Sequence, residues 1–161
     1  MSTTQDELAG VVDLFGALTR PELTAALAEL AFKQGRDVDE SALRATIEQA
    51  IDTYTLVEYE PAGSDGSADP LVAVGPTAFP TLPPNAEDLP HILDSDRRSV
   101  DRERLAEQVS RRLTNEAEAV VEAGDAERAA ELLDVSYDIE AWASADASAV
   151  RSALEPVLPQ D

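Results

Sequence analysis

The chain has 161 residues, and 33 Asp and Glu against 12 Lys and Arg give it a formal net charge of −21. Apolar residues still make up 43% of the sequence, which is more than a disordered acidic tail contains, so the sequence predicts a folded core. The absence of cysteine excludes disulfides and thiolate chemistry. The length fits one moderate core, or a domain of about 80 residues with a helical appendage.

The negative charge is spread over the whole chain: it is −8 over residues 1–60 (12 acids, 4 bases), −6 over 61–96 (6 acids, no base) and −7 over 97–161 (15 acids, 8 bases). Of the twelve bases, Lys33 alone is a lysine. Even acidity with little lysine is typical of cytoplasmic proteins from salt-loving archaea, where molar salt screens the repulsion. The N-terminus lacks the features of a signal peptide, and no apolar run is long enough for a membrane span, so we expect a cytoplasmic protein working at high salt.

Three amphipathic helices are predicted in the first part of the chain, over residues 6–18, 20–34 and 40–54. Thr19 and Glu22 have the spacing of a capping box at the start of the second helix, and Gly35 follows its end. Asp39 is the expected N-cap of the third helix. The inward stripes of the three helices consist of Leu8, Val11, Val12, Phe15 and Leu18; Leu23, Ala26, Leu27, Leu30 and Ala31; and Leu43, Ile47, Ala50, Ile51 and Tyr54.

A β-hairpin is predicted after the third helix. Residues 55–60 are rich in β-branched and aromatic side chains, and residues 71–74 are the natural antiparallel partner. The ten residues between them, PAGSDGSADP, would form the loop. Three helices followed by a hairpin is the order of a winged helix, so the sequence predicts a mainly α fold with a small β-hairpin and a winged-helix-like domain over residues 1–82.

This segment also carries a resemblance. LFGALTRPELTAALAELAFKQG followed by ALRATIEQAIDTYTLVEYE resembles an uncharacterised family of small acidic haloarchaeal proteins, and more distantly winged helix-turn-helix regulators. The first resemblance covers roughly the whole chain and brings no known activity. The second covers residues 6–80 and implies DNA binding by the third helix and the wing.

A proline-rich connector is predicted over residues 83–100, and a helical region over 101–161. Six of the ten prolines fall between Pro70 and Pro90, where Phe79 and Leu82 are expected to pack onto the first domain. Beyond the connector, helices are predicted over residues 101–123, from 126 to about 133 and over 146–157. The pattern between 135 and 142 leaves the structure open, although Tyr137 and Trp142 are expected to anchor the core there, with a recognition patch on the surface as the alternative.

Charge argues against a DNA-binding wing. A helical wheel places Ser41, Ala45, Glu48, Gln49 and Asp52 on the outer face of the third helix, with Arg44 at its margin. No Lys or Arg occurs from Ala45 to Asp96. Because DNA affinity comes largely from cations that replace condensed counterions, this favours a wing that is structural or binds protein.

The basic stretch of the chain is DSDRRSVDRERLAEQVSRRL, residues 94–113. Its arginines have three open interpretations: a solvated helix with internal ion pairs such as Arg112–Glu116, docking onto the acidic N-terminal domain, or contact with nucleic acid or an acidic partner. The six arginines are Arg97, Arg98, Arg102, Arg104, Arg111 and Arg112.

Catalytic motifs are absent from the sequence. His91 is the sole histidine, in the proline-rich connector, and phosphate loops, zinc spacings, calcium loops and nucleophile elbows do not occur. We therefore expect a protein that is not an enzyme and that takes no cofactor and no metal.

The sequence favours a regulatory or protein-interaction module, with a protein partner or self-association ahead of DNA and without a membrane. The alternative is a winged-helix transcriptional regulator, for which Arg111→Glu with Arg112→Glu would abolish DNA binding and leave the fold intact. The candidate partner or nucleic-acid contacts are Arg36, Arg44, Gln49, Arg97, Arg98, Arg104, Arg111 and Arg112.

Overall fold

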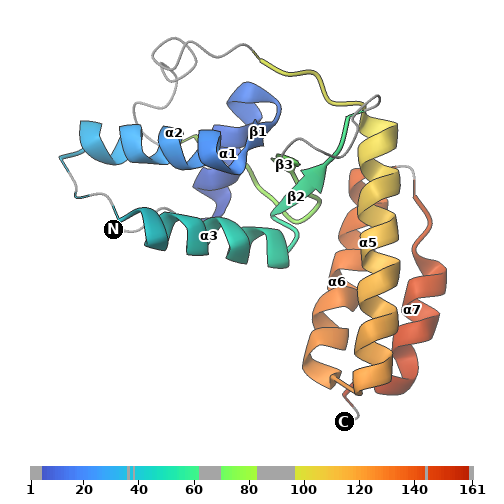
Figure 1. Cartoon of the computed structure of the whole chain (residues 1–161). Helices are drawn as coiled ribbons and strands as arrows, with labels where there is room; N and C mark the ends of the chain where they lie inside the picture. Colours follow the sequence, from blue (N-terminus) through green and yellow to red (C-terminus); the bar gives the residue numbers. More distant parts are fainter. Residues whose placement is uncertain are drawn as a thin grey trace. The chain divides into compact units, whose positions relative to one another are not determined.

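The computed structural model describes residues 5–35, 37, 39–61, 70–82, 97–143 and 145–159. The chain divides into two compact units, Met1–Val100 and Asp101–Asp161, called here the first and second unit. The predicted fold class, mainly helical with a small β-structure, is confirmed (Figure 1). Residues 62–69 of the predicted wing loop, residues 83–96 of the predicted connector, the candidate contact Arg36 and the sole histidine, His91, lie outside the described residues.

The first unit contains three helices and three short strands. Each helix begins where the sequence provides a cap: Thr19 and Glu22 form both hydrogen bonds of the capping box of the second helix, and the Asp39 carboxylate accepts from the Ala42 amide at the third. In chain order the elements are α1 (Gln5–Phe15), β1 (Leu18–Thr19), α2 (Arg20–Lys33), α3 (Glu40–Asp52), β2 (Leu56–Tyr59) and β3 (Leu71–Val74).

The apolar stripe predicted that the first helix would continue to Leu18, but the helix ends at Phe15. Gly16 has a φ of 79°, in the left-handed region, and this turns the chain out of the helix. Leu18 and Thr19 then form strand β1, which sequence reasoning missed. The buried Leu18 side chain fits both assignments, so the apolar pattern could not separate them.

The three strands form an antiparallel sheet in the order β1-β3-β2. The predicted hairpin pairs Leu56 with Val74 and Tyr59 with Leu71, and β1 adds to the other edge of β3 by pairing Leu18 with Val72. The first unit therefore has the order helix, strand, helix, helix, strand, strand.

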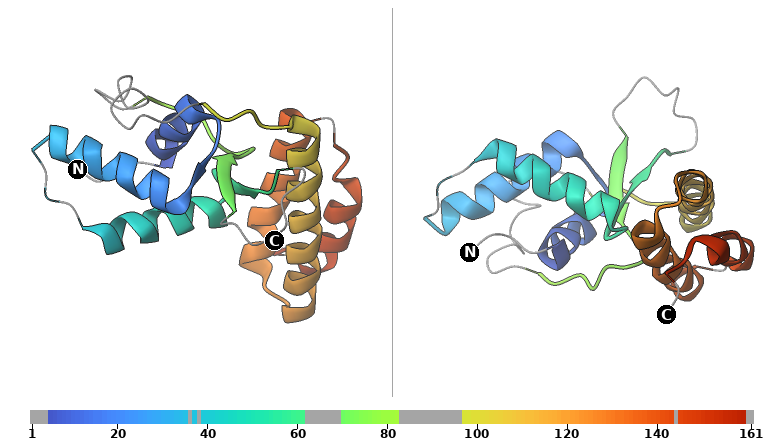
Figure 2. Two further views of the ribbon diagram at one scale, coloured as in Figure 1. Left: turned by 45° about the horizontal axis from the view of Figure 1, so that its top comes forward. Right: turned by 90° about the horizontal axis from the view of Figure 1, so that it is seen from below.

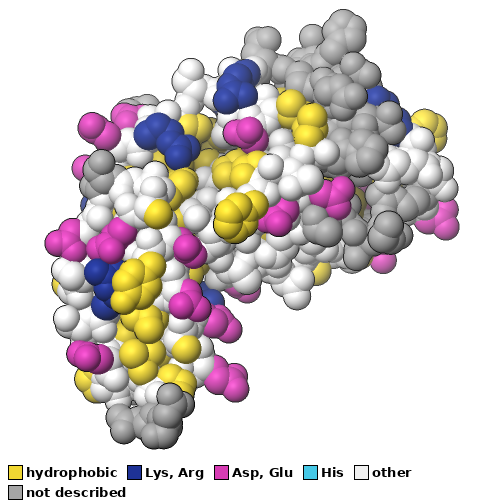
Figure 3. Space-filling model, turned by 180° about the vertical axis from the view of Figure 1, so that it is seen from behind, with side chains coloured by type: hydrophobic (Ala, Val, Ile, Leu, Met, Phe, Trp, Pro, Cys, Tyr) yellow, Lys and Arg dark blue, Asp and Glu magenta, His cyan; other side chains and the backbone are white. Residues whose placement is uncertain are grey.

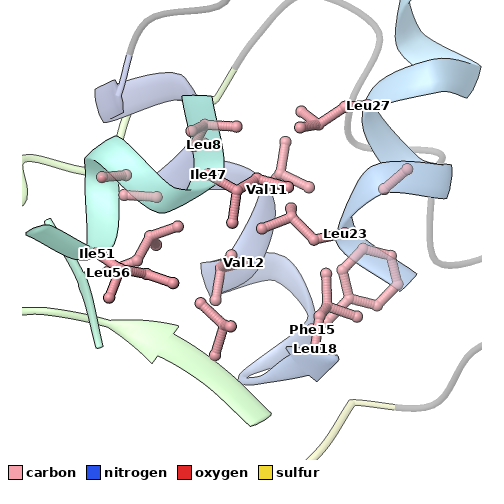
Figure 4. Packing of buried hydrophobic residues seen from close by; sticks show 14 of the residues in the cluster. Leu8, Val11, Val12, Phe15, Leu18, Leu23, Leu27, Ile47, Ile51 and Leu56 are labelled. Atoms are coloured by element: carbon pink, nitrogen blue, oxygen red, sulfur yellow. The ribbon is translucent and has the colours of Figure 1, made fainter. Parts of the chain in front are cut away.

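The core of the first unit gathers around α1. Leu8, Val11, Val12 and Phe15 are fully buried there. Figure 4 shows Val11 of α1, Leu23 of α2 and Ile47 of α3 pointing toward one another. Burying a side chain of this size stabilises the fold by about 1.5–3 kcal/mol, so α1 holds α2, α3 and the sheet together.

The segment after β3 packs differently from the prediction. Phe79 is 78% exposed and Leu82 is 46% exposed, so neither anchors the segment. Instead the Thr81 amide donates to the Asp6 carbonyl (3.0 Å), and its carbonyl lies against Gly10, where a Cβ would overlap it. A glycine on α1, with no side chain, allows this close approach.

The second unit is a bundle of α5 (Arg102–Ala123), α6 (Ala126–Trp142) and α7 (Ser148–Leu154), followed by the short 3₁₀ helix η2 (Glu155–Val157). All three α-helices contact one another, and the right view of Figure 2 looks roughly along α5. Asp101 and Asp125 cap α5 and α6, and Gly124 ends α5 in the left-handed conformation. α6 continues past residue 133 to Trp142 because Leu132, Ser136 and Ile139 extend its buried stripe.

Candidate functional site

The exposed face of α3 carries more acids than bases. Ser41, Ala45, Glu48, Gln49 and Asp52, which the helical wheel places outward, are all exposed. Arg44, at the margin of this face, is also exposed and pairs with Glu40 one turn before it, with an N–O distance of 3.2 Å. The Gln49 amide and the carboxylates are therefore open to solvent, while the cation of this face is matched within the helix.

Arg20, at the start of α2, links three elements and was not among the predicted contacts. Its Nε donates to Glu48 of α3 (2.6 Å), and a second guanidinium nitrogen lies 3.4 Å from Glu58 of β2. The hydrogen bond to Glu48 raises the pKa of the Arg20 guanidinium above its usual value. Arg20 is thus held between two carboxylates.

A groove runs between α2 and α3, with a volume of about 520 Å³. Its α2 wall consists of Arg20, Pro21, Thr24, Ala25 and Ala28, and its α3 wall of Glu40, Arg44, Ile47 and Glu48. We call this the α2–α3 groove. Helices α2 and α3 contact each other, and Figure 1 shows α3 below α2.

Two predicted contact residues, Arg97 and Arg98, bind the first unit itself. Arg97 donates to the carbonyls of Asp13 and Leu14, at 2.7 and 3.2 Å, near the C-terminal end of α1. This placement suits a cation, because the carbonyl end of a helix carries partial negative charge.

Arg98 makes the most extensive polar contacts of the set. Its guanidinium forms two hydrogen bonds with the Glu22 carboxylate, at 2.6 and 3.1 Å, and one with the Ala17 carbonyl at 3.0 Å. Its backbone amide donates to the Phe15 carbonyl at 2.8 Å. Two parallel hydrogen bonds are the preferred geometry of an Arg–carboxylate pair, so Arg98 fastens residues 97–100 to the start of α2.

The Arg98–Glu22 pair predicts a pH-dependent stability. Hydrogen bonding to Arg98 lowers the pKa of Glu22 below its ordinary value of 4.5. An acid with a depressed folded-state pKa stabilises the fold above its unfolded pKa and loses this contribution as pH falls through the folded one. We expect Glu22→Gln to be less stable than the parent at pH 7, with the difference shrinking as the pH falls below 4.5 and vanishing below the lowered pKa of Glu22, in urea unfolding followed by circular dichroism.

The control for this prediction is Glu29→Gln on the same helix, which also removes one carboxylate. Both variants reduce the net negative charge equally, and a glutamine at 22 still offers a carbonyl oxygen to the Thr19 amide, so the capping box is retained. Equal stability changes in the two variants at every pH would contradict the assignment of a specific Arg98–Glu22 pair.

In the second unit, Arg112 joins a network between α5 and α6. Arg112 and Arg128 both bind Glu116, at 2.7 and 2.9 Å, and Arg128 also binds Glu131 at 2.8 Å. Arg104 is half-buried, with a polar partner of its own, whereas Arg111 is exposed. Because Arg112 joins the network that bridges the two helices, Arg112→Glu would disturb the bundle as well as any ligand contact.

Two arginines of the second unit lie over aromatic rings. Arg102 lies 5.2 Å from the centre of the Trp142 ring, and Arg151 lies 4.5 Å from that of Tyr137. Tyr137 is 56% exposed, so it does not anchor the core as the sequence suggested. A hollow of about 780 Å³ extends from Trp142 along α5, and it is lined by both signs of charge, including Arg102, Glu107, Arg111 and Asp146.

The carboxylates do not gather into a metal site in the described part of the chain. No group of three or more His, Asp or Glu side chains there has the arrangement of metal ligands. On the face of the molecule seen in Figure 3, the acidic side chains of the described residues are scattered, with basic ones between them. Across the described ranges, no helix is both long enough and apolar enough to cross a membrane.

Comparisons with known proteins identify a family and no activity. No curated protein and no solved structure matches the chain. A family model, however, matches nearly all of it. The chain belongs to the DUF7109 family, a family of unknown function, whose model matches residues 6–159.

Proposed function

We propose that this chain is a non-enzymatic protein-interaction module with a winged-helix-like first unit, working in a salt-rich cytoplasm. The observation that carries this proposal is the exposed face of α3, which offers Glu48, Gln49 and Asp52 to solvent. The two arginines next to it are already paired with glutamates, Arg20 with Glu48 of this face and Arg44 with Glu40, so Asp52 adds negative charge to a set of matched pairs. The surface is thus suited to a basic protein partner.

The order of elements supports the winged-helix part of the proposal. A winged helix has a helix, a short strand, two further helices and a hairpin, with the first strand added to the edge of the hairpin. The β1-β3-β2 sheet has this arrangement. In such a domain the third helix is the one that reads DNA, so the chemistry of α3 decides between the two functions.

That chemistry supports a protein partner over DNA. Nucleic-acid affinity depends on Lys and Arg that neutralise phosphates, and phosphate contacts position a protein before base contacts can specify a sequence. On α3 the carboxylates of Glu48 and Asp52 would face the phosphates instead. High salt would weaken further whatever attraction Arg44 could supply.

The non-enzymatic part of the proposal rests on composition. Without cysteine and with one histidine, the chain has few candidates for a nucleophile or for a base that titrates near neutral pH. Its many carboxylates are explained by salt adaptation, in which acidic surface groups recur over the whole protein.

A DNA-binding regulator is the second candidate, and the exposed Arg111 favours it together with the order of elements. Arg111→Glu alone is the cleaner test of this role, because Arg112 belongs to the ion-pair network of the bundle. If the chain is a DNA-binding regulator, Arg111→Glu weakens DNA binding in a gel-shift assay and leaves the circular dichroism spectrum unchanged.

Chromatin immunoprecipitation in the native host distinguishes the two functions. We expect a diffuse signal without discrete genomic peaks, because the acidic α3 face lacks the cations that hold a protein on DNA. In the same cells, a photo-crosslinking amino acid at Gln49 should yield protein adducts of defined mass. The matched control places it at the exposed Glu118 of α5, where those adducts should be absent.

Discrete genomic peaks, or crosslinks from Gln49 to nucleic acid, would replace this proposal by the regulator. Identical adducts from Gln49 and Glu118 would mean that α3 is not the contact surface.

A further inference from the structure

Helix α6 has a second apolar stripe, on a different side from the one that packs in the bundle. The core stripe includes the buried Leu132 and Ile139. On the second stripe, the Tyr137 side chain is 56% exposed and Leu133 is half-buried. A helix that is apolar on two sides is normally covered on both, so the second side suits a contact with another molecule. The members of this outer α6 stripe follow one another at spacings of four, three and four residues and are Ala126, Ala130, Leu133 and Tyr137.

An acid follows directly after each member of the outer α6 stripe. One residue further along a helix lies about 100° round its axis, so the four acids form a row along one edge of the stripe. Glu131 binds Arg128 at 2.8 Å, and the other three form no ion pair among the residues that the structure describes. Burial and the charge of Asp134 raise the pKa of Asp138, which agrees with a carboxylate that has no cation beside it. The acidic row consists of Glu127, Glu131, Asp134 and Asp138.

The arginines that contact the outer α6 stripe and its acidic row are already matched. Arg151 lies over the Tyr137 ring and binds Glu140 at 3.0 Å. Arg128 belongs to the network between α5 and α6, in which two arginines meet two glutamates. Within the described part of the second unit, the stripe is therefore bordered by three uncompensated carboxylates, those of Glu127, Asp134 and Asp138.

These charges and the shape of the stripe favour a basic helix. Lys or Arg side chains along one edge of an apolar helix complement the acidic row. The two alanines at the beginning of the stripe let a partner backbone approach closely, and Leu133 and Tyr137 provide larger apolar contacts at its end. A helix that lays its apolar face on such a surface is a recurring mode of peptide recognition.

The other occupants fit less well. The stripe is about 17 Å long, and over a helix width of about 10 Å this makes roughly 170 Å². A stable dimer buries about 800 Å² per partner, so the stripe is too small to hold a second copy of the chain by itself. Two antiparallel α6 helices related by a two-fold axis would also bring their acidic rows to the same side. Nucleic acid would place phosphates against the carboxylates.

We propose that the outer α6 stripe binds a helix of a partner protein that has an apolar face with Lys or Arg along its edge. The inference adds a contact surface in the second unit to the module proposed above, and it is independent of the α3 face.

The test uses the full chain and a fluorescein-labelled peptide of about 16 residues, which is four to five helical turns. The peptide has Leu at helical positions i, i+4, i+7 and i+11, Lys directly after each Leu, and Ala or Gln elsewhere. Fluorescence anisotropy is measured in potassium chloride from about 0.3 to 2 M. We expect the Lys peptide to bind the parent chain, and a matched peptide with Glu in place of Lys to bind about tenfold more weakly at the lowest salt.

A pair of charge variants separates the acidic row from the general negative charge of the chain. Asp134→Asn with Asp138→Asn should weaken binding of the Lys peptide about tenfold at the lowest salt, and less at 2 M, where the charges are screened. The matched control is Glu118→Gln with Glu122→Gln, which removes two exposed carboxylates of α5 in the same unit. It should leave the affinity nearly unchanged.

A second pair of variants tests the apolar contact. Tyr137→Ser removes the most exposed side chain of the stripe and should weaken the Lys peptide about tenfold at every salt concentration, because apolar burial is not screened. Val121→Ser is the control, since Val121 is an exposed apolar residue of α5 in the same unit. It should bind the Lys peptide as the parent does.

Four results would overturn the inference: no binding of the Lys peptide, equal losses in the two charge variants, equal losses in Tyr137→Ser and Val121→Ser, or sedimentation of the parent as a dimer that Tyr137→Ser converts to a monomer. Circular dichroism spectra identify any variant that fails to fold. If Tyr137→Ser is such a variant, the comparison of the two charge variants decides the result.

Discussion

Gly16→Ala is expected to destabilise the first unit by about 3–5 kcal/mol. Gly16 has a φ of 79°, where an L-residue with a Cβ costs about 1–2 kcal/mol. An alanine Cβ there would also overlap the Arg98 carbonyl oxygen, so backbone has to move. The least costly movement detaches residues 97–100 from the rest of the first unit. This breaks several hydrogen bonds, which together contribute about 2–3 kcal/mol of stability.

The detached contacts are specific and mutually supporting. They comprise the bond from the Arg98 amide to the Phe15 carbonyl, the two bonds from its guanidinium to Glu22, and the bonds from Arg97 to the end of α1. Glu22 and Arg98 are both partly exposed, so their ion pair adds less than a buried pair would. The loss is therefore several modest contacts at once.

Two other glycines of the chain are matched controls. Gly35 and Gly124 have φ values of 71° and 68°, nearly that of Gly16, yet a Cβ at either would meet nothing within 4 Å. Gly35→Ala and Gly124→Ala should therefore cost only the conformational part, about 1–2 kcal/mol. Urea unfolding followed by circular dichroism measures all three, and a Gly16→Ala value as small as the controls would show that residues 97–100 do not press against Gly16.

Sequence reasoning identified the features that depend on neighbours in the chain. The capping box at Thr19 and Glu22, the N-cap Asp39 and the helix end at Gly35 each involve residues within a few positions of one another. Helix periodicity then fixed which face is buried, since the helical stripes lie in the core with few exceptions.

The missed features depend on contacts between distant residues. β1 consists of two residues and exists because Leu18 and Thr19 pair with Val72 and Leu71, more than fifty residues later. A two-residue strand has no periodicity, so no signal in the sequence separates it from the end of a helix. In α6 the weak apolar signal beyond Leu133 hid nine further residues of helix, 134–142.

The features of the candidate site also fall into those that depend on chain neighbours and those that depend on distant residues. The exposed face of α3 follows from helix geometry, and the structure exposes each of its five residues. The Arg20 pairs with Glu48 and Glu58, and the attachment of Arg98 to Glu22, join residues 28 to 76 positions apart. Among 33 carboxylates, the sequence gives no indication of which one each arginine meets.

The stability of the whole chain is expected to rise with salt. A net charge of −21 on 161 residues makes repulsion between carboxylates far more frequent than attraction, since 33 acids face 12 bases. At 0.01 M ionic strength the Debye length of about 30 Å lets these charges interact across a domain, and at 1 M it falls to about 3 Å. Salt does not remove the burial of the apolar core, so its main effect is to screen the unfavourable repulsion between carboxylates.

Salt also weakens the favourable ion pairs, which opposes this trend. Most of them, such as Arg44–Glu40, are exposed or partly exposed, and each contributes less than about 1 kcal/mol. Pairs in direct contact are screened less than carboxylates several ångströms apart, so the repulsive part is lost first. The midpoint of thermal unfolding should therefore rise continuously from about 0.05 to 3 M potassium chloride.

A double variant separates charge screening from other effects of salt. Glu118→Lys with Glu122→Lys replaces two exposed acids of α5 and changes the formal net charge from −21 to −17, because each substitution adds two charges. Its midpoint of thermal unfolding should lie above that of the parent at low salt, because it carries less repulsion, and should converge with the parent value at about 3 M. A salt effect on apolar burial would instead act on both chains equally and leave no difference between them.

The midpoint of thermal unfolding in magnesium at matched ionic strength should follow the curve measured in potassium chloride. A parent midpoint that stays flat or falls with potassium chloride would refute the salt-adapted reading, and a large rise with magnesium alone would point to a specific cation site.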